Sequence, residues 1–171
     1  MTASQYEREL KAILEGENKT LDKITKTCSA LEKVNYFKIR EKPFAVIRAA
    51  GSIGVDLVAV RGDISFLTEV KSSISDTLHF SSVGGKLQKQ ADNMYDECKK
   101  TKTLPVYAFR LKGQRGDSWR FFTLNIDGLE GSAGVLQRRL PKIEKSKTGN
   151  FVMRWKNGMP LSDFISYLCK K

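Results

Sequence analysis

Two short apolar segments separated by a turn stand out in the first half of the chain. Val55–Val60 and Ile64–Val70 are rich in valine and isoleucine, and Arg61-Gly62-Asp63 lies between them. This pattern is typical of a β-hairpin, in which a glycine such as Gly62 supplies the positive φ of a tight turn. The pattern therefore predicts two consecutive antiparallel strands.

Apolar residues at intervals of three and four predict helices on both sides of this hairpin. One helix covers residues 4–17 and is capped by Thr2 or Ser4, and another covers Lys86–Thr101. Residues Asn18–Tyr36 repeat the pattern and predict one further helix before the hairpin. Its apolar stripe consists of Leu21, Ile24, Cys28, Leu31 and Val34.

The rest of the chain adds strands and a terminal helix. The serine-rich residues 74–83 and the glycine-rich residues 128–134 predict irregular segments. Because strands alternate with helices, we expect an α/β fold with a central sheet flanked by helices. The further strands are predicted at residues 44–48, 105–111, 119–124 and 151–155, and the terminal helix at 161–168.

Three charged residues, Asp56, Glu69 and Lys71, interrupt the apolar pattern of the hairpin. Residues two apart in a strand share a face, so Glu69 and Lys71 project together, and strand pairing brings Asp56 close to Glu69. Carboxylates this close repel one another unless a cation joins them, and their hard oxygen atoms suit Mg²⁺ or Mn²⁺. The alternative is an amphipathic hairpin whose surface ion pair contributes at most about 1 kcal/mol.

Composition narrows the classes of partner. The 171 residues carry 30 Lys and Arg against 19 Asp and Glu, and this net charge of +11 favours nucleic acid or an anionic membrane surface. The chain lacks a long apolar segment and the apolar core of a signal peptide, so we expect no membrane and a cytoplasmic location. Three scattered cysteines and one histidine predict reduced thiols rather than a zinc site. Without GxGxxG or GxxxxGK[ST], we expect no nucleotide cofactor.

Polar residues outside the hairpin have alternative roles. In the first helix Glu7 and Glu9 flank the apolar stripe on opposite sides, with Glu7 slightly nearer its centre. Each either leans toward a site or favours the positive end of the helix dipole. Residues 49–54, AAGSIG, either admit a phosphodiester backbone, to which Ser52 donates hydrogen bonds, or form a plain turn.

The acid that opens one strand and the E-V-K that closes the next resemble the PD-(D/E)xK nuclease core. ERELKAIL, FAVIRAAGS, VDLVAV and FLTEVKSS resemble, in this order, motifs of the archaeal Holliday-junction resolvases, a branch of these nucleases. Lys89-Gln90-Ala91, PVYAFR and WRFFTL extend the similarity, which covers Tyr6–Leu14 and Phe44–Leu124. The resemblance implies a restriction-endonuclease-like core with a central mixed sheet.

The resemblance also implies a Mg²⁺-dependent endonuclease that cuts four-way DNA junctions, with Mn²⁺ as a substitute metal. It selects Glu7 over Glu9, because the family's helix acid is the first glutamate of E-R-E-L. The implied catalytic residues are Glu7, Asp56, Glu69 and Lys71. The implied metal ligands are Asp56, Glu69, the Val70 carbonyl and, through water, Glu7. The implied DNA-binding residues are Arg8, Arg48, Ser52 and Gln90.

Two segments depart from the motifs of this family. We expect residues 1–124 to form the nuclease core with an inserted helix at about 18–36, and residues 125–171 to form a basic extension packed on it. Arg138 and Arg139 either extend the DNA-binding face through phosphate contacts or belong to a solvated linker. Because a four-way junction has two-fold symmetry, the resemblance also implies a homodimer.

Two other functions are compatible with the same residues. A PD-(D/E)xK endonuclease with a restriction or repair role shares the core and differs in the DNA structure that it cuts. A non-catalytic DNA-binding module keeps the fold alone, but the retention of Asp56, Glu69 and Lys71 together argues against it.

Overall fold

The main sheet has six strands in the order β1-β2-β3-β5-β6-β9. The computed structural model describes residues 1–49, 54–81 and 85–170. Neighbouring strands are antiparallel except β3 and β5, which are parallel, so the sheet is mixed, as predicted. The strands are β1 (Ala45–Arg48), β2 (Leu57–Arg61), β3 (Ile64–Ser73), β5 (Leu104–Leu111), β6 (Trp119–Thr123) and β9 (Met159–Pro160).

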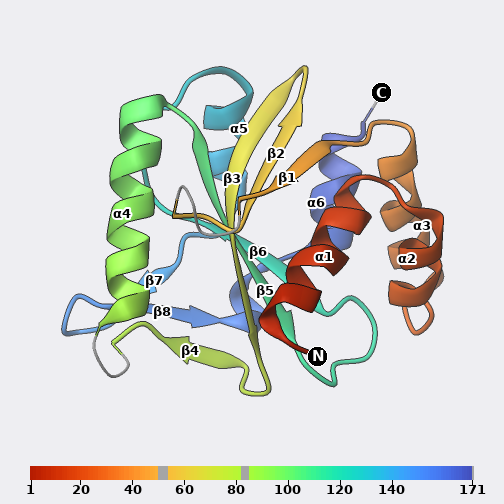
Figure 1. Cartoon of the computed structure of the whole chain (residues 1–171), viewed down its shortest axis with the longest axis horizontal. Coiled ribbons are helices and arrows are strands. Elements are labelled where there is room, and N and C mark those ends of the chain that lie inside the picture. Colours follow the sequence, from red (N-terminus) through yellow and green to blue (C-terminus); the bar gives the residue numbers. More distant parts are fainter. Residues whose placement is uncertain (50–53, 82–84, 171) are drawn as a thin grey trace.

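Helices cover both faces of this sheet (Figure 1). α4 lies on one face, whereas α1 and α6, with α2 and α3 beside them, lie on the other. Phe66 of β3 faces the second group, because its ring lies 5.8 Å from the ring of Phe164 in α6. The helices are α1 (Ala3–Leu14), α2 (Asn18–Ile24), α3 (Ala30–Phe37), α4 (Lys86–Thr101), α5 (Gly131–Arg139) and α6 (Leu161–Leu168), with short 3-10 turns at Lys38–Arg40 and Trp155–Asn157.

A smaller three-stranded sheet has the order β4-β8-β7. It joins β4 (Thr77–His79) to β8 (Phe151–Arg154) and β7 (Glu144–Lys145). The prediction that residues 74–83 are irregular is therefore wrong at Thr77–His79, which form β4. Its pairing partner lies far along the chain, where local sequence pattern gives no information about it.

The predicted helix over Asn18–Tyr36 is instead two helices, α2 and α3, separated by a turn. Ser29 caps α3: its side chain accepts from the Glu32 N–H at 3.2 Å, and the Glu32 carboxylate accepts from the Ser29 N–H at 2.8 Å. This capping box starts a new helix and rotates the apolar stripe out of register. Leu31 and Val34 are consequently exposed, at 69% and 58%, while Tyr36 is buried.

Two glycine-containing segments also differ from expectation. Gly62 does not adopt a positive φ in the hairpin turn, which is held instead by the Arg61 guanidinium on Asp63, 2.5 Å apart. Residues 128–134 are not a free linker, because α5 begins at Gly131. A Cβ on Gly134 would lie 2.3 Å from the Leu129 carbonyl oxygen, so this glycine permits close packing at the start of the helix.

Asp117, in the loop between β5 and β6, connects segments that are far apart in the sequence. Its carboxylate is buried and accepts hydrogen bonds from the Tyr36 hydroxyl at 2.7 Å and from the Ser162 N–H at 2.8 Å. Tyr36 belongs to α3 and Ser162 to α6, and these two helices pack against each other. Asp117 therefore ties α3 and the C-terminal helix to the sheet.

Replacing Tyr36 with phenylalanine should destabilise the protein, because the buried Asp117 carboxylate loses one of its donors. We expect Tyr36→Phe to lower the free energy of unfolding by about 1–3 kcal/mol, measured by urea denaturation. Val34→Ala is the control on the same helix, because Val34 is exposed, and we expect it to change stability by less than about 0.5 kcal/mol. Equal stabilities for wild type and Tyr36→Phe would contradict this role of Asp117.

Candidate active site

The predicted acidic residues Asp56 and Glu69 lie beside each other just before β2 begins. The last pair of the β2–β3 ladder is Leu57 with Thr68, and just beyond it the Asp56 N–H donates to the Thr68 carbonyl at 3.1 Å. The same register places Asp56 opposite Glu69, as the hairpin pattern predicts. β3 runs on to Ser73 without β2 beside it, so the edge of β3 is open at this point.

The side chain of Asp56 accepts a hydrogen bond that β2 would accept if it extended further along β3. Its Oδ2 accepts a hydrogen bond from the Val70 N–H at 2.7 Å. The N–H and the carbonyl of one strand residue point to the same side, so the Val70 carbonyl also faces the edge that β2 leaves open. Two carboxylates and a backbone carbonyl therefore present oxygen atoms to one small region.

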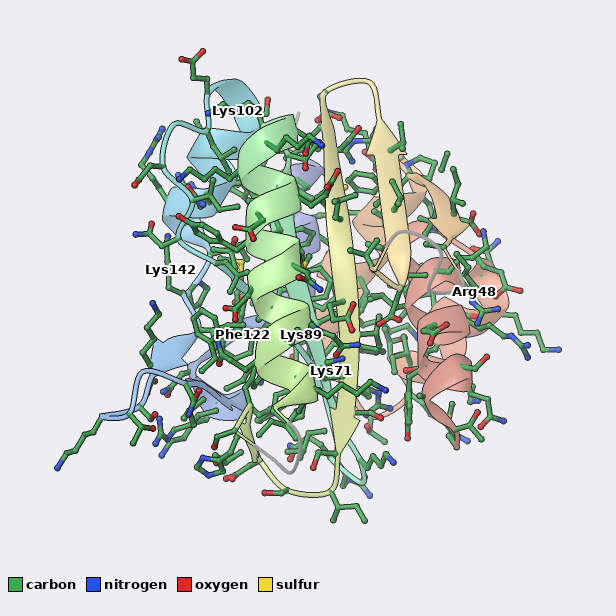
Figure 2. The ribbon with its side chains drawn as sticks, turned by 60° about the vertical axis from the view of Figure 1, so that its left-hand side comes forward. Arg48, Lys71, Lys89, Lys102, Phe122 and Lys142 are labelled. Atoms are coloured by element: carbon green, nitrogen blue, oxygen red, sulfur yellow. The ribbon has the colours of Figure 1, made fainter. Side chains whose placement is uncertain are left out.

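Lys71 lies next to this acidic pair, at the flank of α4 (Figure 2). Its ammonium is 2.6 Å from Glu69 Oε1 and 3.3 Å from the amide oxygen of Gln90 in α4. Three sequence-predicted residues, Glu69, Lys71 and Gln90, are thus in direct contact. Figure 2 also shows Arg48 on the opposite flank of β3.

Burial and mutual repulsion act on both carboxyl groups. Burial raises the pKa of Glu69, which is 4% exposed, and the charges of Asp56 and Glu7 raise it further, while Lys71 opposes the shift. Burial likewise raises the pKa of Asp56, which the Val70 hydrogen bond and Lys71 counteract. The site disfavours the ionised form of both carboxyl groups. A bound cation would stabilise that ionised form.

Helix α1 orients its two glutamates in different directions. Glu7 pairs with Arg48 of β1, with 2.6 Å between Oε2 and Nη2, and its charge raises the pKa of both Asp56 and Glu69. Glu9 instead binds Arg110 at 3.0 Å and accepts from the Trp119 indole N–H at 3.0 Å. Glu7 is therefore the α1 acid beside the cluster, whereas Glu9 anchors the helix to the sheet.

A small pocket of about 150 Å³ adjoins the acids, and the described residues that line it are Gly54, Val55, Asp56, Glu69, Gln90 and Asn93. Asn93 is absent from the sequence predictions. Its spacing of three from Gln90 on α4, which puts both amides on one face of the helix, is the signal that identifies it. Ser52 lies outside the described residues.

Three other predicted DNA-binding residues lie away from this cluster. Arg8 is exposed and lines a shallow pocket with Thr20 and Lys23 of α2. Arg138 and Arg139 are exposed in the last turn of α5, and Arg139 stacks 4.3 Å from the ring centre of Tyr167. α5 reaches β3 near Ile64, which is about 23 Å along the strand from Lys71.

The donor set fits a hard divalent cation. In the described part of the chain no three His, Cys, Asp or Glu side chains form a ready metal cluster. Asp56, Glu69 and the Val70 carbonyl nevertheless supply oxygen atoms, which is the chemistry that Mg²⁺ and Mn²⁺ prefer. The raised pKa values of the two carboxyl groups give a physical reason for a cation to bind there.

Comparisons with known proteins bear on the family and the fold of the chain. A family model described as archaeal Holliday junction resolvase (Hjc) matches residues 26–171, and so includes residues 125–171, which the motif resemblance does not cover. A solved structure of Archaeoglobus fulgidus Hjc, a Holliday junction resolvase from an archaeal hyperthermophile, has a similar fold. It is 19% identical, with a TM-score of 0.51, over 95% of this chain and 94% of that chain. Curated protein sequences give no match, and none of the described helices has the length and apolar character to cross a bilayer.

The raised pKa values predict how the stability of the metal-free protein depends on pH. The folded state keeps protons on Asp56 and Glu69 that the unfolded state loses near the ordinary pKa values of 3.8 and 4.5. Their contribution to stability is therefore present below these values and is lost as the pH rises through the raised pKa values. Asp56→Asn should gain stability relative to wild type as the pH rises above 3.8, measured by urea unfolding in EDTA.

Asp63→Asn is the control with the opposite sign. Arg61 lowers the pKa of Asp63, so this variant should lose stability relative to wild type as the pH rises. A difference between wild type and Asp56→Asn that does not change with pH would contradict the electrostatics described for the cluster.

Proposed function

The chain belongs to the archaeal Holliday junction resolvase family, and we propose that it is a metal-dependent endonuclease that hydrolyses phosphodiester bonds in four-way DNA junctions. Membership of the family makes it a nuclease that resolves Holliday junctions. The observation that supports the reaction centre is that Asp56, bound to the Val70 N–H, lies beside the Glu69–Lys71 ion pair at the edge of β3.

We assign the metal to this cluster, with Mg²⁺ as the natural ion and Mn²⁺ as its substitute. Asp56, Glu69 and the Val70 carbonyl are the direct ligands, and Glu7 acts through a water molecule. When bound, the metal supplies a water of lowered pKa and offsets negative charge on the phosphate. The burial of Glu69 and its repulsion by Asp56 support this assignment.

Lys71 orients the attacking water and donates hydrogen bonds to the phosphate oxygens. Its contact with Glu69 at 2.6 Å holds the ammonium beside the acids before substrate arrives. Positive charge placed where phosphate charge develops is an effective means of transition-state stabilisation. Gln90, 3.3 Å from the same ammonium, restrains it from the side of α4.

DNA binding in this proposal depends on backbone contacts rather than base contacts. Arg48 and Gln90 border the cluster, and we assign Arg8 and Ser52 to further contacts with the DNA backbone. Arg138 and Arg139 serve a second stretch of DNA, because α5 lies at the far end of β3. The net charge of +11 supports a polyanionic substrate.

The assembly that we propose is a homodimer, because a four-way junction has two-fold symmetry and two strands must be cut. Each subunit then carries one reaction centre. Residues 125–171 act with the core at 1–124, to which β9 contributes a strand through its pairing with β6.

Cleavage of a labelled immobile junction tests the proposal directly. With Mg²⁺, wild type should make paired symmetric nicks in the junction and leave a matched linear duplex intact, and EDTA should abolish cutting. Asp56→Asn should lower the cleavage rate by at least about 100-fold, because the cluster loses a charged ligand. Asp63→Asn removes the same charge from the hairpin turn, where Asp63 forms an ion pair with Arg61, and should cut like wild type.

Each outcome has a separate meaning. Equal cutting of the duplex would contradict selectivity for junction structure and would indicate an endonuclease with another DNA target. Tight junction binding without metal-dependent cutting would contradict the nuclease centre. Equal rates for wild type and Asp56→Asn would contradict the assignment of Asp56.

A further inference from the structure

Tyr107 has a buried hydroxyl group without a hydrogen-bond partner among the described residues. Its side chain is fully buried, at 0% exposure. A buried hydroxyl that makes no hydrogen bond destabilises the folded state, and a phenylalanine at the same place would avoid this loss. The unsatisfied hydroxyl therefore calls for a partner in another state of the protein.

The sheet places Tyr107 directly beside the acidic cluster. It lies on β5, where the parallel register pairs it with Glu69 of β3. Paired residues in neighbouring strands share a face, so the two side chains project together toward α4. On the other side Phe122 of β6 is the register partner of Tyr107, and the Phe80 ring lies 5.7 Å away. Phe122 and Phe80 thus provide apolar neighbours for the phenol ring, and Glu69 provides a carboxylate beside it.

Electrostatics agrees with this placement. After burial, the charge of Glu69 is the largest influence that raises the pKa of Tyr107, followed by the charge of Asp56. The phenol therefore keeps its proton at neutral pH, so its hydroxyl remains available as a donor to a carboxylate. In the metal-free protein the donor that Glu69 uses is Lys71, at 2.6 Å.

We propose that Tyr107 is a positioning residue for metal binding, and that its hydroxyl donates a hydrogen bond to the Glu69 carboxylate when a divalent cation displaces Lys71. This inference rests on the proposed function, because it assumes that Glu69 is a metal ligand. A cation beside Glu69 repels the Lys71 ammonium, and the carboxylate then needs another donor to hold its orientation. Hydrogen bonds of this kind to ligating carboxylates tune metal affinity.

The test compares wild type with Tyr107→Phe in the full chain without DNA. Mn²⁺ binding is measured by the loss of the electron paramagnetic resonance signal of free Mn²⁺, and the unfolding midpoint in urea is measured in EDTA. We expect Tyr107→Phe to bind Mn²⁺ about 10–100-fold more weakly. Its midpoint in EDTA should equal or exceed that of wild type, because no hydroxyl is left unpaired. A purely structural role would lower the midpoint and leave Mn²⁺ affinity unchanged.

Tyr167→Phe is the matched control. It removes a hydroxyl from α6, and it should alter neither Mn²⁺ affinity nor the midpoint. Equal Mn²⁺ affinity in wild type and Tyr107→Phe would overturn the role of Tyr107 and leave the proposed function intact. Failure of wild type itself to bind Mn²⁺ would overturn both.

Discussion

The hydrogen bond from the Val70 N–H to the Asp56 carboxylate is the interaction on which the site depends. β2 is shorter than β3, so backbone groups of β3 beyond Thr68 have no partner on β2. A side chain of the shorter strand, rather than its backbone, completes the ladder there. The fold thereby fixes a carboxylate at the edge of a rigid strand, and Glu69 and Lys71 follow at the spacing of the pleat.

The surrounding helices hold this edge from both faces of the sheet. On one face Glu9 anchors α1 to Arg110 and Trp119, so that Glu7, two residues earlier, is turned toward Arg48 and the acids. On the other face α4 brings Gln90 within reach of Lys71. Because separate elements supply these groups, small shifts of either helix would change the electrostatics of the cluster without changing its residues.

Local pattern predicted the parts of the fold that local forces decide. α4 and α6 have the predicted bounds, because their apolar periodicity runs from end to end. The alternation of the hairpin strands likewise predicted the register that places Asp56 opposite Glu69. The break before Ser29 was missed because its capping box competes with an apolar stripe that continues through it. The distant position of Arg139 depends on packing between segments far apart in sequence, which periodicity does not report.

The end of the sheet formed by β9 has a consequence for association between chains. β9 is only two residues long, and one of them is Pro160, which has no N–H to offer. A further strand cannot be added there with a regular ladder, so this edge is protected from the edge-to-edge pairing that leads to aggregation. Among the described strands of the main sheet, β1 forms the opposite end. Contacts of another molecule with the β9 end would therefore depend on side chains rather than on a regular ladder.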